Sequence, residues 1–391
     1  MLKYITITFA LILAIMDLIA YKRLVRNNVK KSITKSFAIT AIVINVMPLL
    51  VPLLFIFSNG TFIMKLSMVL LTVFIVITLC RSILYLFWLF TENWKLLYCG
   101  VVVSFAVFLL FMYGVFVTRT DYKINELELS FKNLPVSFDG FRVAFISDMH
   151  VGAMYNAEAE LEKIVDIISG TDADVILFGG DLINFHHSEL TPPILEKLSF
   201  IKGKQGTLAV LGNHDTGAYF MDSLNTPRSV NKKLVEEKLR GIGWLLLRDS
   251  TKFFYSGNDS IAITGIDYTD RLLDFKHKFN NIDNYDVSHV YSMFDDSIFN
   301  ITISHLPMLW YELCDKGYSD LTLSGHIHSM QLKYDIFGVS LSPAAWMYEE
   351  WSGLYERERG KLYINDGLGT VGFCARLGAR PEITVIKLKK L

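Results

Sequence analysis

The chain has 391 residues, of which 52% are hydrophobic, and its mean hydropathy of +0.35 is high for a purely soluble protein. Its 38 basic and 39 acidic residues leave a net charge of −1, so the chain lacks the basic surface by which proteins bind nucleic acids. None of its four cysteines forms a CxxC pair, which leaves a structural zinc site without support.

The hydrophobic excess lies before about residue 118 and predicts a helical transmembrane region over residues 1–117. A helix needs roughly 20 apolar residues to cross the hydrocarbon core of a bilayer. Arg81 interrupts the third apolar stretch, and that span could therefore end near Cys80, with residues 81–95 at the cytoplasmic interface. We expect about four spans, at residues 4–21, 37–58, 66–90 and 96–117.

The charges of the first loop predict the orientation of these spans. Basic short loops stay in the cytoplasm, which places the N-terminus and the end of the fourth span outside. The basic cluster follows the first apolar run instead of preceding it, so a retained span is favoured over a cleaved signal peptide. Asp17 in the first span could pair with Arg81, but a place at the interface is the simpler account. The cluster comprises Lys22, Arg23, Arg26, Lys30, Lys31 and Lys35.

Residues 118–135 are predicted to be a juxtamembrane linker that leads into a first strand, and residues 136–391 form the large domain. Helical spacing follows at Ala157–Ile168 and Val230–Leu239. Alternating strands and helices, followed by a strand-rich second half, predict an α/β fold of two stacked sheets flanked by helices. Strands are expected at Arg142–Ser147, Val175–Phe178, Leu208–Leu211, Trp244–Leu247, Ile261–Ile266, Asn300–Ser304, Leu321–Ser324, Lys361–Ile364 and Ile383–Leu388.

Five of the apolar strand-like runs end in residue types that bind metals. Sites in sheets of this kind form at the carboxyl ends of strands, where side chains of several strands converge. Asp, His and Asn give mixed oxygen and nitrogen ligation, which suits Mn, Fe or Zn better than calcium. Two metals about 3.5–4 Å apart can hold the attacking and leaving oxygens of a phosphoryl group, and Asp181 is the candidate bridge between them. The runs read VAFISDMH, VILFGGD, LAVLGNHD, ITISH and LTLSGHIH.

The ordered set DMH, GGD, GNHD, SH and GHIH resembles the calcineurin-like metallophosphoesterases, particularly their bacterial membrane-anchored branch, over roughly residues 134–391. The resemblance implies a four-layer αββα sandwich. It also implies two divalent metal ions whose activated hydroxide would attack phosphorus. The first metal would be held by Asp148, His150, Asp181 and His328, and the second by Asp181, Asn213, His305 and His326.

The resemblance further assigns two catalytic residues. His214 would face the substrate and protonate the leaving oxygen or stabilise developing charge, and Asp215 would orient His214. One departure concerns GHIHSMQ, in which Ser329 and Met330 stand where this branch usually has two glycines. The added side chains put the identity of the substrate in doubt.

These observations predict a membrane-anchored hydrolase of a phosphomonoester, phosphodiester or pyrophosphate, with its domain outside the inner membrane and a lipid-linked phosphate among its candidate substrates. The alternatives are a non-catalytic metal-binding receptor or scaffold and, last, a transporter. His186 and His187 could line the pocket or lie in a solvated loop. Trp346 and its aromatic neighbours could be core or touch a membrane, and Cys314 and Cys374 could pair or be two buried thiols.

Overall fold

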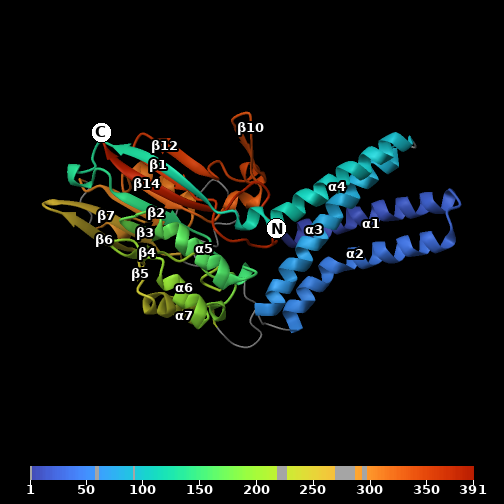
Figure 1. The fold of residues 1–391 in the computed structure, drawn as a ribbon, viewed down its shortest axis with the longest axis horizontal. Helices are drawn as coiled ribbons and strands as arrows, with labels where there is room; N and C mark the ends of the chain where they lie inside the picture. The colour runs from blue at the N-terminus through green and yellow to red at the C-terminus, as the bar shows by residue number, and fades with distance from the viewer. Residues whose placement is uncertain (1, 58–60, 91–92, 218–226, 269–286, 293–296) are drawn as a thin grey trace. The chain divides into compact units, whose positions relative to one another are not determined.

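The computed structural model describes residues 2–57, 61–90, 93–217, 227–268, 287–292 and 297–391 (Figure 1). The chain divides into two compact units. The first contains Met1–Val117 together with Gly372–Ala375, and the second contains Thr118–Val371 and Arg376–Leu391. Cys314 and Cys374 are both buried thiols, and no disulfide joins them.

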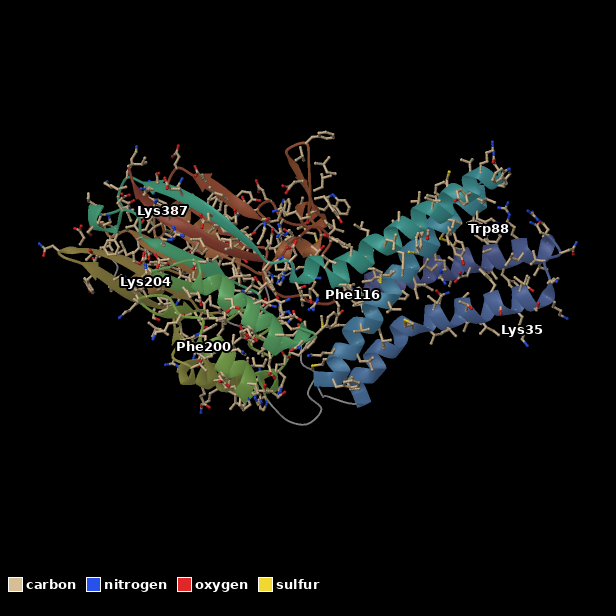
Figure 2. All side chains as sticks on the ribbon, in the orientation of Figure 1. Lys35, Trp88, Phe116, Phe200, Lys204 and Lys387 are labelled. Carbon is tan, nitrogen blue, oxygen red and sulfur yellow. The ribbon has the colours of Figure 1, made fainter. Side chains whose placement is uncertain are left out.

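The first unit consists of long helices in the places where apolar stretches predict them. Two helical segments of the described chain, Phe62–Leu89 and Trp94–Thr120, are long and apolar enough to cross a membrane. Large apolar side chains such as Val101, Phe105 and Phe116 of α4 are exposed, as expected of a helix that faces lipid (Figure 2). The helices are α1 (Leu2–Arg26), α2 (Lys31–Phe57), α3 (Thr61–Phe90) and α4 (Trp94–Phe116).

Helix α3 continues through Arg81, so the helix itself does not end near Cys80, where the third span could end. The guanidinium of Arg81 lies 3.4 Å from a carboxylate oxygen of Asp17 in α1 and donates a 2.9 Å hydrogen bond to Asn45 in α2. Asn45 donates in turn to Asp17 at 2.6 Å, and the hydroxyl of Tyr85 donates to the other oxygen of Asp17. Asp17 is therefore buried and paired with Arg81, as the sequence allowed.

The second unit contains a six-stranded mixed sheet in which residues expected in a linker form an edge strand. Strands β2, β3, β4 and β5 are parallel to one another. Strand β14 is antiparallel to β2 and parallel to β1. The strands are, in spatial order, β1 (Lys123–Phe131), β14 (Glu382–Lys390), β2 (Arg142–Ile146), β3 (Val175–Phe178), β4 (Thr207–Ala209) and β5 (Leu245–Leu246). Half of the predicted linker 118–135 is thus part of the sheet, as the first strand into which it was predicted to lead.

A second six-stranded mixed sheet lies on the first. Its four central strands are parallel, and its two outer strands are antiparallel to their neighbours. A separate hairpin of β10 (Tyr334–Ile336) and β11 (Val339–Leu341) completes the strands of this unit. In spatial order the second sheet holds β12 (Gly353–Arg357), β13 (Gly360–Ile364), β9 (Leu321–Ser324), β8 (Asn300–Ser304), β7 (Asp259–Ile266) and β6 (Ser250–Ser256).

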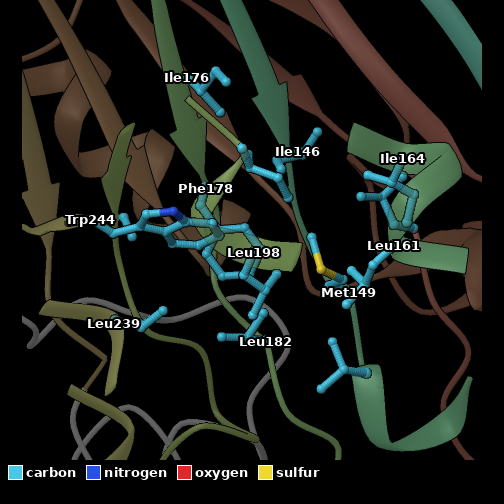
Figure 3. Packing of buried hydrophobic residues seen from close by; sticks show 14 of the residues in the cluster. Ile146, Met149, Leu161, Ile164, Ile176, Phe178, Leu182, Leu198, Leu239 and Trp244 are labelled. Carbon is cyan, nitrogen blue, oxygen red and sulfur yellow. The ribbon is translucent and has the colours of Figure 1, made fainter. Parts of the chain in front are cut away.

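Because side chains along a strand point alternately to the two faces of the sheet, each face of the first sheet packs against a different layer. Val143 and Phe145 of β2 pack with Ile263 and Ile303 of the second sheet, so they face the core between the sheets. The intervening Ala144 and Ile146 face the opposite way. There they pack against α5 (Ala157–Ser169), α6 (Pro192–Ser199) and α7 (Arg228–Gly241) through residues that include Leu161, Leu198 and Leu239 (Figure 3).

Helix α9 (Trp310–Lys316) covers the outer face of the second sheet. Its Trp310 and Cys314 pack against Leu362 and Ile364 of β13. The order of layers is helices, sheet, sheet and helix, and the predicted α/β class with two stacked sheets is confirmed.

Candidate metal centre

The seven predicted ligands all lie just beyond the carboxyl ends of parallel strands. Asp148 and His150 follow β2, Asp181 follows β3 and Asn213 follows β4 of the first sheet. From the second sheet, His305 follows β8, and His326 and His328 follow β9. Because the two sheets stack, the strand ends of both bring their side chains to one place.

The backbone of these segments is strained. Asp148, His150, Asp181, His326 and His328 have φ values of 52°, 46°, 58°, 74° and 53°, all in the left-handed region. For residues other than glycine this conformation costs about 1–2 kcal/mol each. Such strain persists where the surrounding structure fixes it, and it concentrates at functional sites.

A first group of ligand atoms comes from Asp148, His150, Asp181 and His328, all buried and all within 4.8 Å of one another. Nε2 of His328 lies 3.0 Å from Oδ1 of Asp148 and 3.3 Å from Nε2 of His150. Nε2 of His150 lies 3.8 Å from Oδ2 of Asp181. The side chains of Asp148, His150 and His328 therefore point, together with that of Asp181, into one small volume.

A second group consists of Asp181, His305 and His326, again with ligand atoms within 4.8 Å. Nε2 of His305 lies 3.3 Å from Oδ2 of Asp181 and 2.9 Å from Oδ1 of Asn213. Nδ1 of His326 lies 2.9 Å from the same oxygen of Asn213. Asn213 thus belongs to this group, and Asp181 is shared by both groups.

The donor set fits two divalent cations. Asp148 and Asp181 are fully buried, and within the described residues neither forms an ion pair with a lysine or arginine. Buried carboxylates are costly unless a cation compensates them. Two groups of oxygen and nitrogen donors that share one carboxylate provide separate places for two such cations, with the histidine and asparagine ligation typical of Mn, Fe or Zn.

Charges inside the centre shift its pKa values in opposite directions. Burial would lower the pKa of His305, but the carboxylate of Asp181 outweighs it and raises the pKa to about 9. Burial, together with the neighbouring His305, lowers the pKa of His326 to about 3. Burial would raise the pKa of Asp148, yet the charge of His328 holds it below its usual range. Both carboxylates are therefore ionised at neutral pH, because His305 likewise holds the pKa of Asp181 well below its usual range although burial opposes it.

His214 lies beside both groups without belonging to either. Its backbone N–H donates to Oδ1 of Asp181 at 2.8 Å, and its ring meets the ring of His150 edge-on at 4.7 Å between centroids. Nδ1 lies 2.5 Å from the carbonyl oxygen of Asn184. A carbonyl can only accept, so Nδ1 carries the proton and Nε2 is the nitrogen that can accept one. Burial lowers the pKa of His214.

Asp215 does not orient His214 as the resemblance implies. Its carboxylate accepts four backbone hydrogen bonds, and none joins it to His214 in the described part of the chain. It therefore ties the loop after β3 to the loop after β4. The donors are the N–H groups of Asp181 at 2.8 Å, Leu182 at 2.9 Å, Ile183 at 3.1 Å and Gly212 at 2.9 Å.

The residue that orients His214 is Asn184, and its loop is held by Glu189; we did not predict either from the sequence. The buried carboxylate of Glu189 accepts from the N–H groups of Asn184 at 2.6 Å, Phe185 at 2.7 Å and His186 at 3.1 Å. A Cβ at Gly152 would lie 2.1 Å from Glu189, which explains the glycine there. The only sequence signal is the acidic residue three positions after His186, a capping pattern.

The structure also places two further pairs of residues that the sequence singled out. His186 and His187 are half-buried in this loop and belong to neither ligand group. Ser329 and Met330 adopt left-handed φ values of 50° and 48°, the conformation that favours glycine. The buried hydroxyl of Ser329 donates to the carboxylate of Asp366, which anchors this strained segment directly after His328.

Comparisons with known proteins agree with this geometry. Residues 141–330, which contain all seven ligands, match the sequence model of the calcineurin-like phosphoesterases. The chain is 29% identical over 284 residues to the uncharacterized metallophosphoesterase YkuE of Bacillus subtilis, covering 71% of this chain and 90% of that protein. It is 28% identical over 285 residues to a transmembrane protein with metallophosphoesterase domain from Danio rerio, covering 71% of this chain and 60% of that protein.

Among solved structures, a Thermus thermophilus sulfate thiohydrolase, SoxB, aligns with 60% of this chain and 53% of its own at 12% identity and a TM-score of 0.37. This similarity is too low to transfer a substrate.

Proposed function

The domain that carries this centre belongs to the calcineurin-like phosphoesterase family, and we propose that the chain is a membrane-anchored, metal-dependent phosphoesterase. The observation that carries the proposal is the convergence of seven strand-end ligands into two groups that share Asp181. Its reaction would be hydrolysis of a phosphomonoester, a phosphodiester or a pyrophosphate.

Each residue of the centre has a role in this reaction. When bound, two divalent cations would supply Lewis acidity toward the phosphoryl oxygens and an activated nucleophile. Asp148, His150 and His328 would hold one cation and Asn213, His305 and His326 the other, with Asp181 available to both. These side chains follow strand ends, and all of them except the half-buried His326 are buried, so their positions need little reorganisation.

His214 is the candidate proton carrier. Asn184 holds its Nδ1, so Nε2 is the nitrogen that would exchange a proton with an oxygen of the substrate next to the ligands. A non-catalytic receptor on the same fold would need the ligands but not a histidine held in this way, so the placement of His214 favours the enzyme.

The membrane part of the proposal rests on the four apolar helices. We propose that α1 to α4 cross the inner membrane and that the domain lies on its outer face, because the end of α1, the following loop and the start of α2 are basic. Phosphoesters found at that surface, lipid-linked ones among them, are then the natural substrates. A reporter fused after residue 391 tests this orientation, and a cytoplasmic signal would contradict it.

Activity is tested with the detergent-solubilised full chain, bis-p-nitrophenyl phosphate and Mn²⁺. His214→Ala is expected to lower kcat by about 10²- to 10⁴-fold while the bound metal, measured by mass spectrometry, stays unchanged. His187→Ala, a histidine outside both ligand groups, is the control and should retain turnover. If the wild-type chain shows no metal-dependent turnover on a panel of phosphoesters, the enzyme proposal fails.

A further inference from the structure

The β10–β11 hairpin exposes a set of apolar side chains that the metal centre does not use. The hairpin projects from the sheets of the domain (Figure 1). Phe337 at its tip is completely exposed, at 101% of its reference area, and Trp346 shortly after β11 is 88% exposed. Ile336, Val339 and Leu341 are exposed as well. Contiguous exposed apolar groups of this kind mark an interaction surface.

The backbone conformation of the hairpin turn is unfavourable for a phenylalanine at position 337. Phe337 and Gly338 connect the two strands, with φ values of 51° and 82°. A two-residue turn with both residues left-handed favours Asn-Gly, because bulky side chains disfavour that conformation. A strained and fully exposed aromatic residue at this position is best explained by a partner that contacts it.

The hairpin is firmly attached beside the metal centre. It begins six residues after the ligand His328, and Lys333 at its base donates a backbone hydrogen bond to Leu377 at 3.0 Å. On the other side, the hydroxyl of Ser342 donates to the carbonyl of Ser329 at 2.8 Å. A contact at the hairpin tip is therefore held close to the ligands.

The chain enters the domain at the end of the first sheet from which Asp148 and His150 follow. Lys123, the first residue of β1, is in register with Glu382 of β14, and β14 runs antiparallel to β2. The start of β1 therefore lies at the carboxyl end of β2, where Asp148 and His150 follow.

The segment between α4 and β1 is itself fixed to the domain. Arg119 is buried, lies 2.9 Å from the carboxylate of Glu160 and covers the ring of Tyr155 at 4.0 Å. Helix α4 ends at Phe116 (Figure 2), so only two residues separate the last helical residue from this anchored arginine. If α4 crosses a membrane, the anchored start of the domain follows that membrane after only a few residues of chain.

We propose that the β10–β11 hairpin inserts its apolar tip into the lipid bilayer next to the metal centre. The proposal rests on the membrane anchoring proposed above. Between Ile336 and Leu341 the hairpin carries no charged residue, which fits the boundary between headgroups and acyl chains and does not fit a charged partner. Aromatic side chains such as Phe337 and Trp346 are typical of that boundary. The hairpin would then bring the phosphate of a lipid-linked substrate to the ligands.

The test uses the full chain reconstituted into vesicles of phosphatidylcholine and phosphatidylglycerol. The photoreactive residue p-benzoylphenylalanine replaces Phe337 in one variant and Tyr255 in a control. Tyr255 is 74% exposed on β6, which Figure 1 draws well apart from β10. After irradiation, lipid adducts are measured by mass spectrometry. We expect at least about fivefold more lipid adduct at position 337, because burial in lipid is favourable for an exposed aromatic ring.

Other outcomes overturn the proposal. Equal lipid adducts at 337 and 255, or adducts at 337 to a second copy of the chain, would show that the bilayer is not the partner. If the 337 variant does not fold, judged by gel filtration, the probe at Trp346 replaces it with the same expected ratio. The adduct needs no catalysis, so it is distinguished from a failure of the enzyme proposal, which shows as absent turnover of bis-p-nitrophenyl phosphate.

Discussion

Two buried clusters of charged and polar side chains, one in the helical region and one at the strand ends, differ in how their carboxylates are compensated. In the helical region both oxygens of Asp17 accept hydrogen bonds, and Arg81 supplies the opposite charge. At the strand ends Asp148 and Asp181 have histidines around them but, among the described residues, no ion pair with lysine or arginine. The carboxylate of the first cluster is paired with a cation of the protein itself, whereas the carboxylates of the second are left with ligand atoms for bound cations.

The difference separates a stabilising cluster from a binding site. The charge-paired network of Asp17, Asn45 and Arg81 joins α1, α2 and α3 and should tolerate replacement of all its members by apolar residues. The strand-end cluster keeps its buried carboxylates charged only if a group such as a bound cation compensates them. Altering each cluster should therefore change different properties: stability for the helical cluster, and metal binding and turnover for the strand-end cluster.

The largest effect is expected from Asp181→Ala. Loss of the carboxylate shared by both ligand groups should lower kcat/KM by about 10³-fold or more, equivalent to roughly 4 kcal/mol of the barrier. The measurements are turnover of bis-p-nitrophenyl phosphate and metal content. Asp172→Ala is the control, since Asp172 has a similar φ of 52° but is exposed. Equal activity in both variants would contradict the assignment of Asp181.

Arg81→Met tests the helical cluster. It leaves Asp17 buried without its cation and should lower the stability of the helical region by about 3 kcal/mol, measured by thermal unfolding in detergent. The double variant with Asp17→Leu and Arg81→Met should recover most of that loss, since no charge then remains buried. Metal content should be normal in both. A double variant as unstable as the single one would show that the pair itself stabilises the helices.

Removing metal with EDTA should make the stability of the domain depend on pH. In the metal-free protein the pKa of His305 is raised to about 9 by Asp181, above its unfolded value near 6.5. The resulting stability is complete below pH 6.5 and is lost as the pH rises through 9, by an amount on the order of 3 kcal/mol. Thermal unfolding between pH 6 and 9.5 measures it. With Mn²⁺ bound, His305 is a neutral ligand and the decline should disappear. A decline that persists unchanged in His305→Gln would point to another group.

The smallest effect concerns the strained segment after His328. Met330→Gly and Met330→Ala both remove the thioether side chain, but only glycine relieves the left-handed φ of 48°. Met330→Gly should therefore be more stable than Met330→Ala by about 1 kcal/mol, measured by thermal unfolding of the metal-loaded protein. Equal stabilities would mean that this segment is not strained.

Much of the fold and the ligand set could be predicted because both depend on local patterns. Alternation as in Val143–Ile146 identifies strands, and the rule that parallel strand ends converge is enough to bring Asp148, Asp181 and His305 together. The partner of His214 could not be found in this way. A backbone carbonyl, that of Asn184, holds the ring, and every residue type carries such a carbonyl, so no sequence motif reveals it.

The pairing of β1 with β14 and the existence of the β10–β11 hairpin escaped prediction for a different reason. Residues 123–131 alternate in burial, but their partner β14 lies about 250 residues later, so pairing could not be inferred from neighbours in the sequence. The hairpin is apolar and exposed, whereas apolar residues are usually expected in a core.

The place of β14 between β1 and β2 has a consequence for how the domain is made. β1 is among the first parts of the domain to be synthesised, yet its neighbour in the sheet comes from residues 382–390. Until those residues leave the ribosome, β1 and the open edge of β2 have no partner, and unpaired edges invite aggregation. We therefore expect the first sheet to close only late in synthesis, and truncation before residue 382 to leave a chain that chaperones retain or proteases remove.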